Sequence, residues 1–370
     1  MNITDVARGE RSLTIEWDGQ SRVEYPYIWL RDNDPNELHP DTKERVFDLT
    51  SVDIDIQPTS LQLSDSDVAI EWPQKAQASV YDIEWLFEHQ PGVVRQDPAA
   101  VGRTVWLGKD LEPLPRASAQ ACRDSNAALA GMLADLKRFG LVIVDQLDDD
   151  IDAGIEFGNR IGYKRDNNFG AIFNVESKPD PNNLAYTSVH LPLHTDLPNQ
   201  EHVPGYQFLH AYKNSATGGE SIFADGYAVC RDVKAEAPDD YALLSRIDVP
   251  WRFHDETHDI RAHRPVIIER PDGEVDALVF NAHIADLPDM PADVMIEYYG
   301  AYQRLMQRIR REEYAVHYRL KAGEMAVFDN YRVMHGRAAF DPTSGERHYR
   351  GYYIDRVEVD SRLRVLDRGE

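Results

Sequence analysis

Short apolar runs, separated by turn residues, recur along this chain and restrict its fold more than any other feature. Some of these runs alternate apolar and polar residues, as a strand with one buried face does, and others are wholly apolar. They occupy residues 13–17, 68–72, 206–212, 277–280 and 325–328. Helical patterns flank the runs instead of alternating with them, so the sequence predicts an antiparallel or barrel-like sheet.

A smaller number of segments repeat their apolar residues at helical spacing. Helices are expected at residues 126–139, 151–161 and 291–311. The first should be capped by Asp124 or Ser125 and should end at Gly140, because glycine adopts the left-handed conformation that closes a helix. Residues 141–144 then form a buried strand. Together these elements predict an α+β fold that is mainly β.

The length of 370 residues is typical of two domains. Residues 1–108 form the predicted small β-rich N-terminal domain. Residues 109–125 contain Pro113 and Pro115 and have little periodicity, so they are interpreted as a linker. Residues 126–370 form the second and larger domain.

Composition excludes several classes of function. The chain has 40 Lys and Arg against 64 Asp and Glu, a net charge of −24. Such a surface repels nucleic acid and favours solubility, and it is compatible with a cationic substrate. No apolar run is long enough for a membrane span, and no secretory signal is expected at the N-terminus. Two cysteines make neither a disulfide framework nor an all-cysteine zinc site, so a cytoplasmic location is expected.

Candidate chemistry is concentrated around His194 and Asp196. A His-x-Asp pair offers an imidazole and a carboxylate from one face of a strand. A third ligand from elsewhere, for which His335 is a candidate, would complete a two-histidine, one-carboxylate set that suits non-haem Fe(II). A bare pair of this kind is also common among ordinary polar residues. Arg347 suits either a dicarboxylate or a surface ion pair.

Two rival metal motifs lack the surroundings that a metal site of their kind needs. His190 and His194 have the spacing of a zinc helix, but Pro192 lies between them. His254 and Glu256 belong to residues 252–258, a charged stretch without a surrounding apolar strand, which we interpret as a solvated loop. Glycine-rich phosphate loops are absent from the sequence, so nucleotide binding has no support.

With these residues in place, the sequence resembles the Fe(II)- and 2-oxoglutarate-dependent oxygenases of the taurine dioxygenase superfamily. The agreement is closer with the γ-butyrobetaine dioxygenase branch, which includes trimethyllysine dioxygenase. The matching stretches are residues 27–33, 182–187, 193–198, 218–221 with 225–226, and 328–337. They occur in order over nearly the whole chain, and that ordered set is specific where a single stretch is not.

The resemblance implies a double-stranded β-helix, or jelly-roll, catalytic domain behind the small N-terminal domain. It implies iron held by His194, Asp196 and His335. Its other implied site residues are Arg347, Ser221 and Leu209 for 2-oxoglutarate, Phe169, Phe173, Tyr186 and Tyr353 for a trimethylammonium group, and Asn183 and Asn281 for the substrate carboxylate. Aromatic faces suit a quaternary ammonium, which has no N–H group to donate. Phe169 and Phe173 would also be ordinary core residues.

The implied reaction is the hydroxylation of γ-butyrobetaine to L-carnitine with O2, releasing succinate and CO2. The resemblance admits ascorbate as an accessory reductant, a small cationic substrate as partner and a homodimer as the assembly. Two other interpretations stay open. One is a related oxygenase that hydroxylates or demethylates another betaine or trimethylated amine such as trimethyllysine. The other is a non-catalytic betaine-binding protein, for which three metal ligands would serve no purpose.

The sequence departs from the family in two places. Phe169 and Phe173 stand where relatives usually have Tyr and Trp, which bind a cation more strongly, so another quaternary or methylated amine stays open as the substrate. Relatives also carry three cysteines and a later histidine in the N-terminal domain. Here residues 34–40 contain no cysteine, so no structural zinc is expected, and hydrogen bonds and packing should hold this loop.

Overall fold

The computed structural model describes residues 3–19, 22–73, 75–177 and 184–369. The chain divides into two compact units, Met1–Asp97 and Pro98–Glu370. Residues 109–125, which the sequence analysis interprets as a linker, lie in the second unit. They contain the end of a 3-10 helix (Gly108–Leu111), strand β7 (Arg116–Ser118) and helix α3 (Ala119–Asp124). Two prolines therefore interrupt periodicity there without making the segment a free connection.

The first unit is built from two three-stranded antiparallel sheets and two short helices. One sheet contains β1 (Ile3–Arg8), β2 (Ser12–Trp17) and β3 (Arg22–Pro26), and the other contains β4 (Ser60–Leu63), β5 (Asp67–Glu71) and β6 (Ser79–Asp82). Helices α1 (Tyr27–Asp32) and α2 (Ile83–Glu88) complete it. Alternate residues of β2 are fully buried, which confirms the period-two prediction for this strand.

The loop after α1 is organised around the carboxylate of Asp34, whose side chain is fully buried. That carboxylate accepts hydrogen bonds from Lys75, from Ser79 and from the backbone N–H of Asn36, the last at 2.9 Å. Arg31 lies 3.8 Å away. A buried carboxylate requires such compensation, so ion pairs and hydrogen bonds join the elements that meet at this loop.

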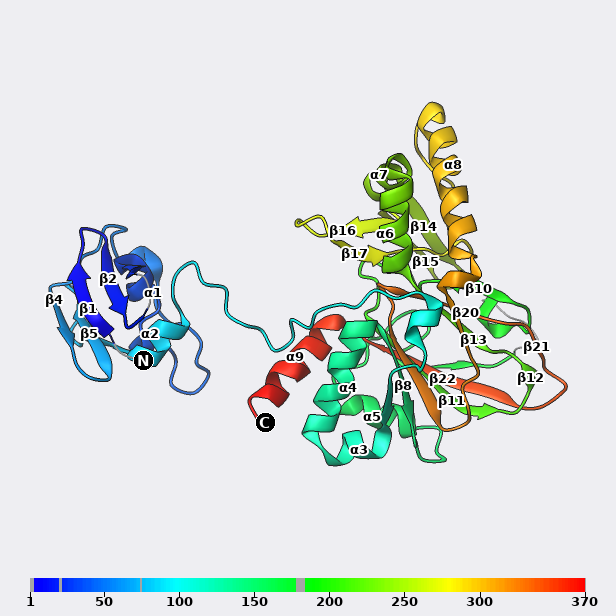
Figure 1. Cartoon of the computed structure of the whole chain (residues 1–370), viewed down its shortest axis with the longest axis horizontal. Helices are drawn as coiled ribbons and strands as arrows, with labels where there is room; N and C mark the ends of the chain where they lie inside the picture. The colour runs from blue at the N-terminus through cyan, green and yellow to red at the C-terminus, as the bar shows by residue number, and fades with distance from the viewer. Residues whose placement is uncertain (1–2, 20–21, 74, 178–183, 370) are drawn as a thin grey trace. The chain divides into compact units, whose positions relative to one another are not determined.

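The second unit contains two facing sheets that form a jelly-roll (Figure 1). The larger sheet has the order β7, β8 (Leu141–Asp145), β19 (Glu324–Asp329), β11 (Tyr206–Asn214), β22 (Arg347–Ile354) and β9 (Phe173–Val175). The smaller sheet has the order β10 (Leu191–His194), β20 (Val333–Arg337), β13 (Ser221–Asp225) and β18 (Ala315–Tyr318). Short strands β12 (Thr217–Gly218) and β21 (Phe340–Asp341) pair with each other. This architecture confirms the predicted fold class.

Side chains of the larger sheet alternate between two cores. On β8, Val142 and Val144 pack in the core that includes α4 (Asn126–Phe139), α5 (Ala153–Asn159) and α9 (Arg356–Asp367), whereas Leu141 and Ile143 point to the inside of the jelly-roll. Figure 1 shows α4 between β8 and α9. The inner face carries the site described below, because strand period two brings every second residue of β11 and β22 to it.

The helix predictions hold closely. Ser125 caps α4, its hydroxyl accepting from the N–H of Ala128, and Gly140 ends the helix with a φ of 76°. A third core joins α6 (Gly226–Glu236), α7 (Pro238–Arg246) and α8 (Ala292–Ile309) to two hairpins. These hairpins are β14 (Val249–His254) with β15 (Asp259–Arg264), and β16 (Ile267–Glu269) with β17 (Val275–Leu278). In the described part of the chain, no helix combines the length and apolarity that a membrane crossing needs.

Residues 252–258 are not simply a solvated loop. Residues 252–254 are the end of β14, and Phe253 is buried. Arg252 is held by Asp259 through two hydrogen bonds of 2.8 and 3.0 Å. The charged side chains pair with each other across the hairpin, so they do not prevent a strand from forming here.

Candidate active site

A cavity of about 540 Å³ opens at the inner faces of the two sheets in the second unit. It is lined by eleven of the twelve residues expected to bind metal, 2-oxoglutarate or substrate. These are Phe169, Phe173, Tyr186, His194, Asp196, Leu209, Ser221, Asn281, His335, Arg347 and Tyr353. The twelfth, Asn183, lies outside the described residues. Residues more than 180 positions apart in the sequence therefore share one cavity.

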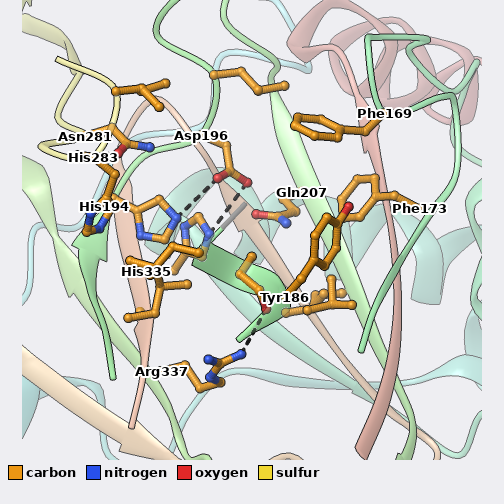
Figure 2. Close-up of a pocket in the computed structure, with 18 of the residues that line it drawn as sticks. Phe169, Phe173, Tyr186, His194, Asp196, Gln207, Asn281, His283, His335 and Arg337 are labelled. Carbon is orange, nitrogen blue, oxygen red and sulfur yellow. Dashed lines mark hydrogen bonds and ion pairs between the residues drawn. The ribbon is translucent and has the colours of Figure 1, made fainter. Parts of the chain in front are cut away.

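Three of these residues converge as a metal-ligand set (Figure 2). His194 Nε2 lies 3.3 Å from Asp196 Oδ1, and His335 Nε2 lies 3.6 Å from Asp196 Oδ2. Donor atoms of His194, Asp196 and His335 all lie within 4.8 Å of one another. Adjacent corners of a metal site with bonds of about 2.1 Å are about 3 Å apart, so two imidazoles and one carboxylate fit a facial set with open positions.

Strand register explains why the three residues meet. His194 ends β10 directly opposite His335 on β20 in the antiparallel ladder. Asp196 follows two residues later, and Leu197 then turns the backbone with a φ of 55°. Such a positive φ is unusual for leucine, so the surrounding contacts must impose it.

Hydrogen bonds around the ligands prepare them for a metal. The Nδ1–H of His194 donates to the carbonyl of Pro192 at 2.9 Å, which leaves the Nε2 lone pair for a metal. The hydroxyl of Tyr353 donates to Asp196 at 2.6 Å. Burial would raise the pKa of Asp196, but His335, His194 and this hydroxyl hold that pKa well below its usual range. Burial also lowers the pKa of His335 to about 3, so its imidazole is neutral, as a ligand requires.

Asn330 fixes the backbone of the carboxylate ligand. Its side-chain oxygen accepts from the N–H of Asp196 at 2.6 Å, and its side-chain NH2 donates to the carbonyls of Asp196 at 3.0 Å and Pro204 at 3.1 Å. Asn330 is fully buried. Its amide therefore continues the pairing of the chain beyond the end of β10, where Asp196 has no strand partner of its own.

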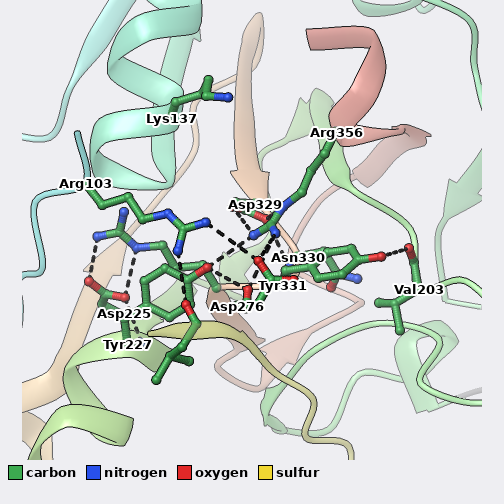
Figure 3. Close-up of polar contacts among 12 residues, drawn as sticks. Arg103, Lys137, Val203, Asp225, Tyr227, Asp276, Asp329, Asn330, Tyr331 and Arg356 are labelled. Carbon is green, nitrogen blue, oxygen red and sulfur yellow. Dashed lines mark hydrogen bonds and ion pairs between the residues drawn. The ribbon is translucent and has the colours of Figure 1, made fainter. Parts of the chain in front are cut away.

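Two ion pairs hold the turn that carries Asn330 (Figure 3). Arg356 donates to Asp329 at 2.7 and 3.1 Å, and Arg332 donates to Asp225 at 2.7 and 3.0 Å. Both pairs are of the forked type that a guanidinium makes with a carboxylate. They connect the turn that carries Asn330 to α9 and to the start of α6.

Another part of the cavity is cationic. Arg347, Ser221 and Leu209 all face it, as expected for a 2-oxoglutarate site. The guanidinium of Arg347 lies over the rings of Tyr349, at 4.0 Å, and Phe340, at 5.1 Å. Burial lowers the pKa of Arg347. Among the described residues, no carboxylate forms an ion pair with Arg347.

The expected aromatic residues surround a different part of the cavity. The Phe173 and Tyr353 rings are 5.3 Å apart, and Phe169 meets Phe253 edge to face at 5.2 Å. Figure 2 shows Phe169, Phe173 and Tyr186 on one side of Asp196 and Asn281 on the other. The side chain of Asn281 already bonds the backbone, donating to the carbonyl of Thr195 at 3.2 Å and accepting from the N–H of His283 at 3.1 Å.

Sequence reasoning did not identify several residues that line the cavity. They are Gln207, Arg252, Phe253, His254, His283 and Arg337 among others. Gln207 could have been found, because period two places it on the same face of β11 as Leu209. Phe253 carries no such signal, since charged residues surround it in the sequence. Within the described lining, Asp196 is the only carboxylate, although the whole chain carries a net charge of −24.

Comparison with known protein families agrees with this geometry. Residues 110–353 match the model of the taurine catabolism dioxygenase TauD, TfdA family. The chain belongs to this family. Residues 4–87 match a second model, the gamma-butyrobetaine hydroxylase-like N-terminal family. The protein is therefore an Fe(II)- and 2-oxoglutarate-dependent dioxygenase that acts on a small molecule, and His194, Asp196 and His335 can hold its iron.

Similar proteins extend over nearly the whole chain. A gamma-butyrobetaine dioxygenase of Pseudomonas sp. (strain AK-1) is 36% identical over 96% of this chain and 94% of its own length. A gamma-butyrobetaine dioxygenase of Homo sapiens is 29% identical over 97% and 95%. A mitochondrial trimethyllysine dioxygenase of Homo sapiens is 26% identical over 96% and 88%. A solved structure described as a putative alpha-ketoglutarate-dependent taurine dioxygenase from Burkholderia xenovorans has the same fold, with a TM-score of 0.50, 16% identity, and coverage of 62% of this chain and 84% of its own.

Proposed function

We propose that the protein hydroxylates γ-butyrobetaine to L-carnitine, consuming 2-oxoglutarate and O2 and releasing succinate and CO2. The observation that carries this proposal is a cavity that has aromatic rings and a metal-ligand set but, among its described lining residues, no carboxylate besides Asp196. The likeness to gamma-butyrobetaine dioxygenases over the length of the chain supports it.

The charge of the cavity favours a quaternary ammonium over other cations. A primary amine or a guanidinium needs hydrogen-bond acceptors, and in a low-dielectric site it usually pairs with a carboxylate. Here the one carboxylate of the described lining belongs to the metal-ligand set. A trimethylammonium group needs no acceptor and is attracted by ring faces, at about 0.5–2 kcal/mol for each good contact.

The residues would act as follows. Bound iron would supply the oxidising chemistry, with His194, Asp196 and His335 as its ligands. Arg347 would take the distal carboxylate of 2-oxoglutarate, with Ser221 and Leu209 beside it. The aromatic residues Phe169, Phe173, Tyr186 and Tyr353 would enclose the trimethylammonium group. Asn281, together with Asn183 outside the described residues, would bind the substrate carboxylate.

In these roles the protein binds and orients the substrate and the co-substrate. Fixing the substrate at both ends presents one carbon to the metal and excludes water from the reaction. Tyr353 would serve twice, since its ring faces the cavity while its hydroxyl donates to Asp196. We also propose that the protein works as a cytoplasmic homodimer, a proposal based on the family resemblance and tested by light scattering of the purified chain.

A succinate-release assay tests the proposed function. The substrates are γ-butyrobetaine, trimethyllysine, and an uncharged analogue with a tert-butyl group in place of the trimethylammonium group. We expect γ-butyrobetaine to be hydroxylated with the highest kcat/KM. Tyr186→Leu should reduce the kcat/KM for γ-butyrobetaine by about tenfold more than that for the uncharged analogue. Equal losses, or no hydroxylated product from γ-butyrobetaine, would contradict the proposal.

Trimethyllysine is the second candidate substrate. Phe169 and Phe173 bind a cation more weakly than the Tyr and Trp expected there, and trimethyllysine dioxygenases are also similar to nearly the whole chain. A higher kcat/KM for trimethyllysine would select this candidate. A non-catalytic betaine-binding protein would instead bind γ-butyrobetaine without releasing succinate.

A further inference from the structure

Arg337 is a buried arginine on β20 that the proposed reaction does not use. It lies two residues after His335 and lines the cavity, with 5% of its surface exposed. Its Nη1 donates to the carbonyl of Ala185 at 3.1 Å, and its Nη2 donates to the carbonyls of Thr187 at 2.7 Å and Val189 at 2.9 Å. Figure 2 shows Arg337 in the cavity with one of these bonds. One guanidinium thus holds three alternate carbonyls of a single segment.

That segment connects two parts of the site. It begins with the 3-10 helix Leu184–Tyr186, which places Tyr186 in the cavity, and it leads into β10 and His194. The N–H of Phe340 donates to the carbonyl of Ser188 at 3.1 Å. Four carbonyls of residues 185–189 therefore bond to the short stretch that runs from Arg337 to Phe340. The segment is irregular in structure, so these bonds take the place of a strand ladder.

The charge of Arg337 is as informative as its bonds. No carboxylate of the described residues forms an ion pair with it. The guanidiniums of Arg337 and Arg347 lie over the same Phe340 ring, at 4.9 and 5.1 Å from its centre. Both guanidiniums contact one ring, and the charge of Arg347 acts on that of Arg337. Like charges repel each other more strongly where water is excluded. A dianion bound beside Arg347 would offset that repulsion, and the guanidinium of Arg337 would then be held more firmly against the carbonyls.

We propose that Arg337 is a positioning residue that holds the segment of residues 184–190, and with it Tyr186, against the metal site, and that it does so most firmly when a dicarboxylate occupies the site beside Arg347. This inference rests on the proposed function for the identity of the dicarboxylate, 2-oxoglutarate. It means that co-substrate binding prepares the aromatic part of the cavity for the substrate, because one side chain touches the segment and shares a ring with the co-substrate arginine.

Backbone hydrogen exchange of residues 184–190 tests the inference without turnover. The full chain would be measured with Fe(II) under nitrogen, with and without 2-oxoglutarate. In the unsubstituted protein, exchange of this segment should slow by about tenfold when 2-oxoglutarate binds, since stronger hydrogen bonds contribute about 1 kcal/mol each. Arg337→Gln should abolish most of that change. Arg337→Lys, which keeps the charge but cannot span three carbonyls, should retain part of it.

Arg160→Lys is the matched control. Arg160 also donates to backbone carbonyls, those of Cys122 and Arg123, but it lies outside the cavity lining. The Arg160→Lys substitution should leave the hydrogen exchange of residues 184–190 unchanged. If Arg337→Gln does not fold, Arg337→Lys still decides the matter, because unaltered protection of the segment in that variant would overturn the inference.

The ratio of succinate to hydroxylated product gives a second readout. Arg337→Lys should raise this ratio by about threefold or more and should raise the KM for γ-butyrobetaine more than the KM for 2-oxoglutarate, since a loosened Tyr186 no longer fixes the substrate. A merely structural role would lower kcat without changing the ratio. If the unsubstituted protein neither binds nor consumes 2-oxoglutarate, the proposed function fails. If it does both and the Arg337 variants behave as it does, the inference about Arg337 fails.

Discussion

Two pairs of arginines inside the second unit differ in their partners. Behind the metal-ligand set, Arg332 pairs with Asp225 and Arg356 pairs with Asp329, each through two hydrogen bonds. In the cavity, Arg337 and Arg347 face no carboxylate of the described residues except Asp196, which lies among the metal ligands.

The difference does not reflect a shortage of carboxylates, because the chain has 64 acidic residues against 40 basic ones. A buried charge without a partner costs stability, so a fold retains it where a ligand supplies the partner. The paired arginines hold the scaffold, and we expect the unpaired arginines to lie where an anion binds. Substitutions in the two pairs should therefore affect different quantities.

The largest effect is expected for the paired arginines. Arg332→Met leaves Asp225 buried without its partner and should lower the free energy of unfolding by about 3–5 kcal/mol. Chemical denaturation of the metal-free protein measures this loss. The double variant Arg332→Met with Asp225→Leu should recover part of it. A loss below about 1 kcal/mol would show that the pair is not structural.

Arg347→Met should have the opposite signature. The KM for 2-oxoglutarate should rise by about 100-fold, because a forked, charge-assisted contact to a carboxylate is lost. The free energy of unfolding of the metal-free protein should not fall, since an unpaired charge has been removed. Steady-state kinetics and denaturation check the two halves of this prediction. Destabilisation with an unchanged KM would move Arg347 into the structural group.

The sequence predicted the parts of this arrangement that follow from local periodicity. Period two placed alternate residues of 206–212 on one face. Asp124 or Ser125 marked the start of a helix and Gly140 its end, and Ser125 proved to be the cap. The spacing of His194 and Asp196 suggested a shared metal. What joins His335 to them is the register between β10 and β20, which depends on contacts between distant strands. The sequence pattern therefore left His335 as a candidate, and the family resemblance selected it as the third ligand.

The unpredicted residues share a physical reason. Asn330 acts on Asp196 from across the chain, and Phe253 faces the cavity because β14 pairs with β15. Neither role leaves a pattern in the neighbouring sequence. The charged residues around Phe253 even suggested a solvated loop, because a sequence does not show that Arg252 and Asp259 neutralise each other across a hairpin. Site residues on loops and hairpins are harder to predict than those on long strands.

Asn330 links the paired arginines to the metal site. It lies in the turn that these arginines hold, and its side chain bonds the backbone of the metal ligand Asp196. Asn330→Ala removes three hydrogen bonds, two of them to the backbone of Asp196. We expect metal affinity to weaken by about 10–100-fold, as for other residues that orient metal ligands. Titration with Co(II), followed by absorbance, measures this. Asn330→Asp is the matched control, because it keeps the acceptor for the Asp196 N–H and loses the donor. The metal affinity of this variant should lie between that of the unsubstituted protein and that of Asn330→Ala.

The smallest effect tests whether the aromatic part of the cavity extends beyond the four expected residues. Phe253 is buried, lines the cavity and meets Phe169 edge to face. Phe253→Leu keeps an apolar side chain but removes the ring. It should lower the preference for γ-butyrobetaine over its uncharged tert-butyl analogue by about two- to fivefold, which corresponds to about 0.5–1 kcal/mol for one ring.

The control for this last variant is Phe157→Leu, which makes the same change in the helix-covered core away from the cavity. It should lower stability without altering the preference between the two substrates. The ratio of the two kcat/KM values is the measurement, because a general loss of activity cancels in it. An unchanged ratio in Phe253→Leu would restrict cation binding to Phe169, Phe173, Tyr186 and Tyr353. It would also make Phe253 a packing residue, so the hairpin of β14 and β15 would shape the cavity without contributing to its choice of charge.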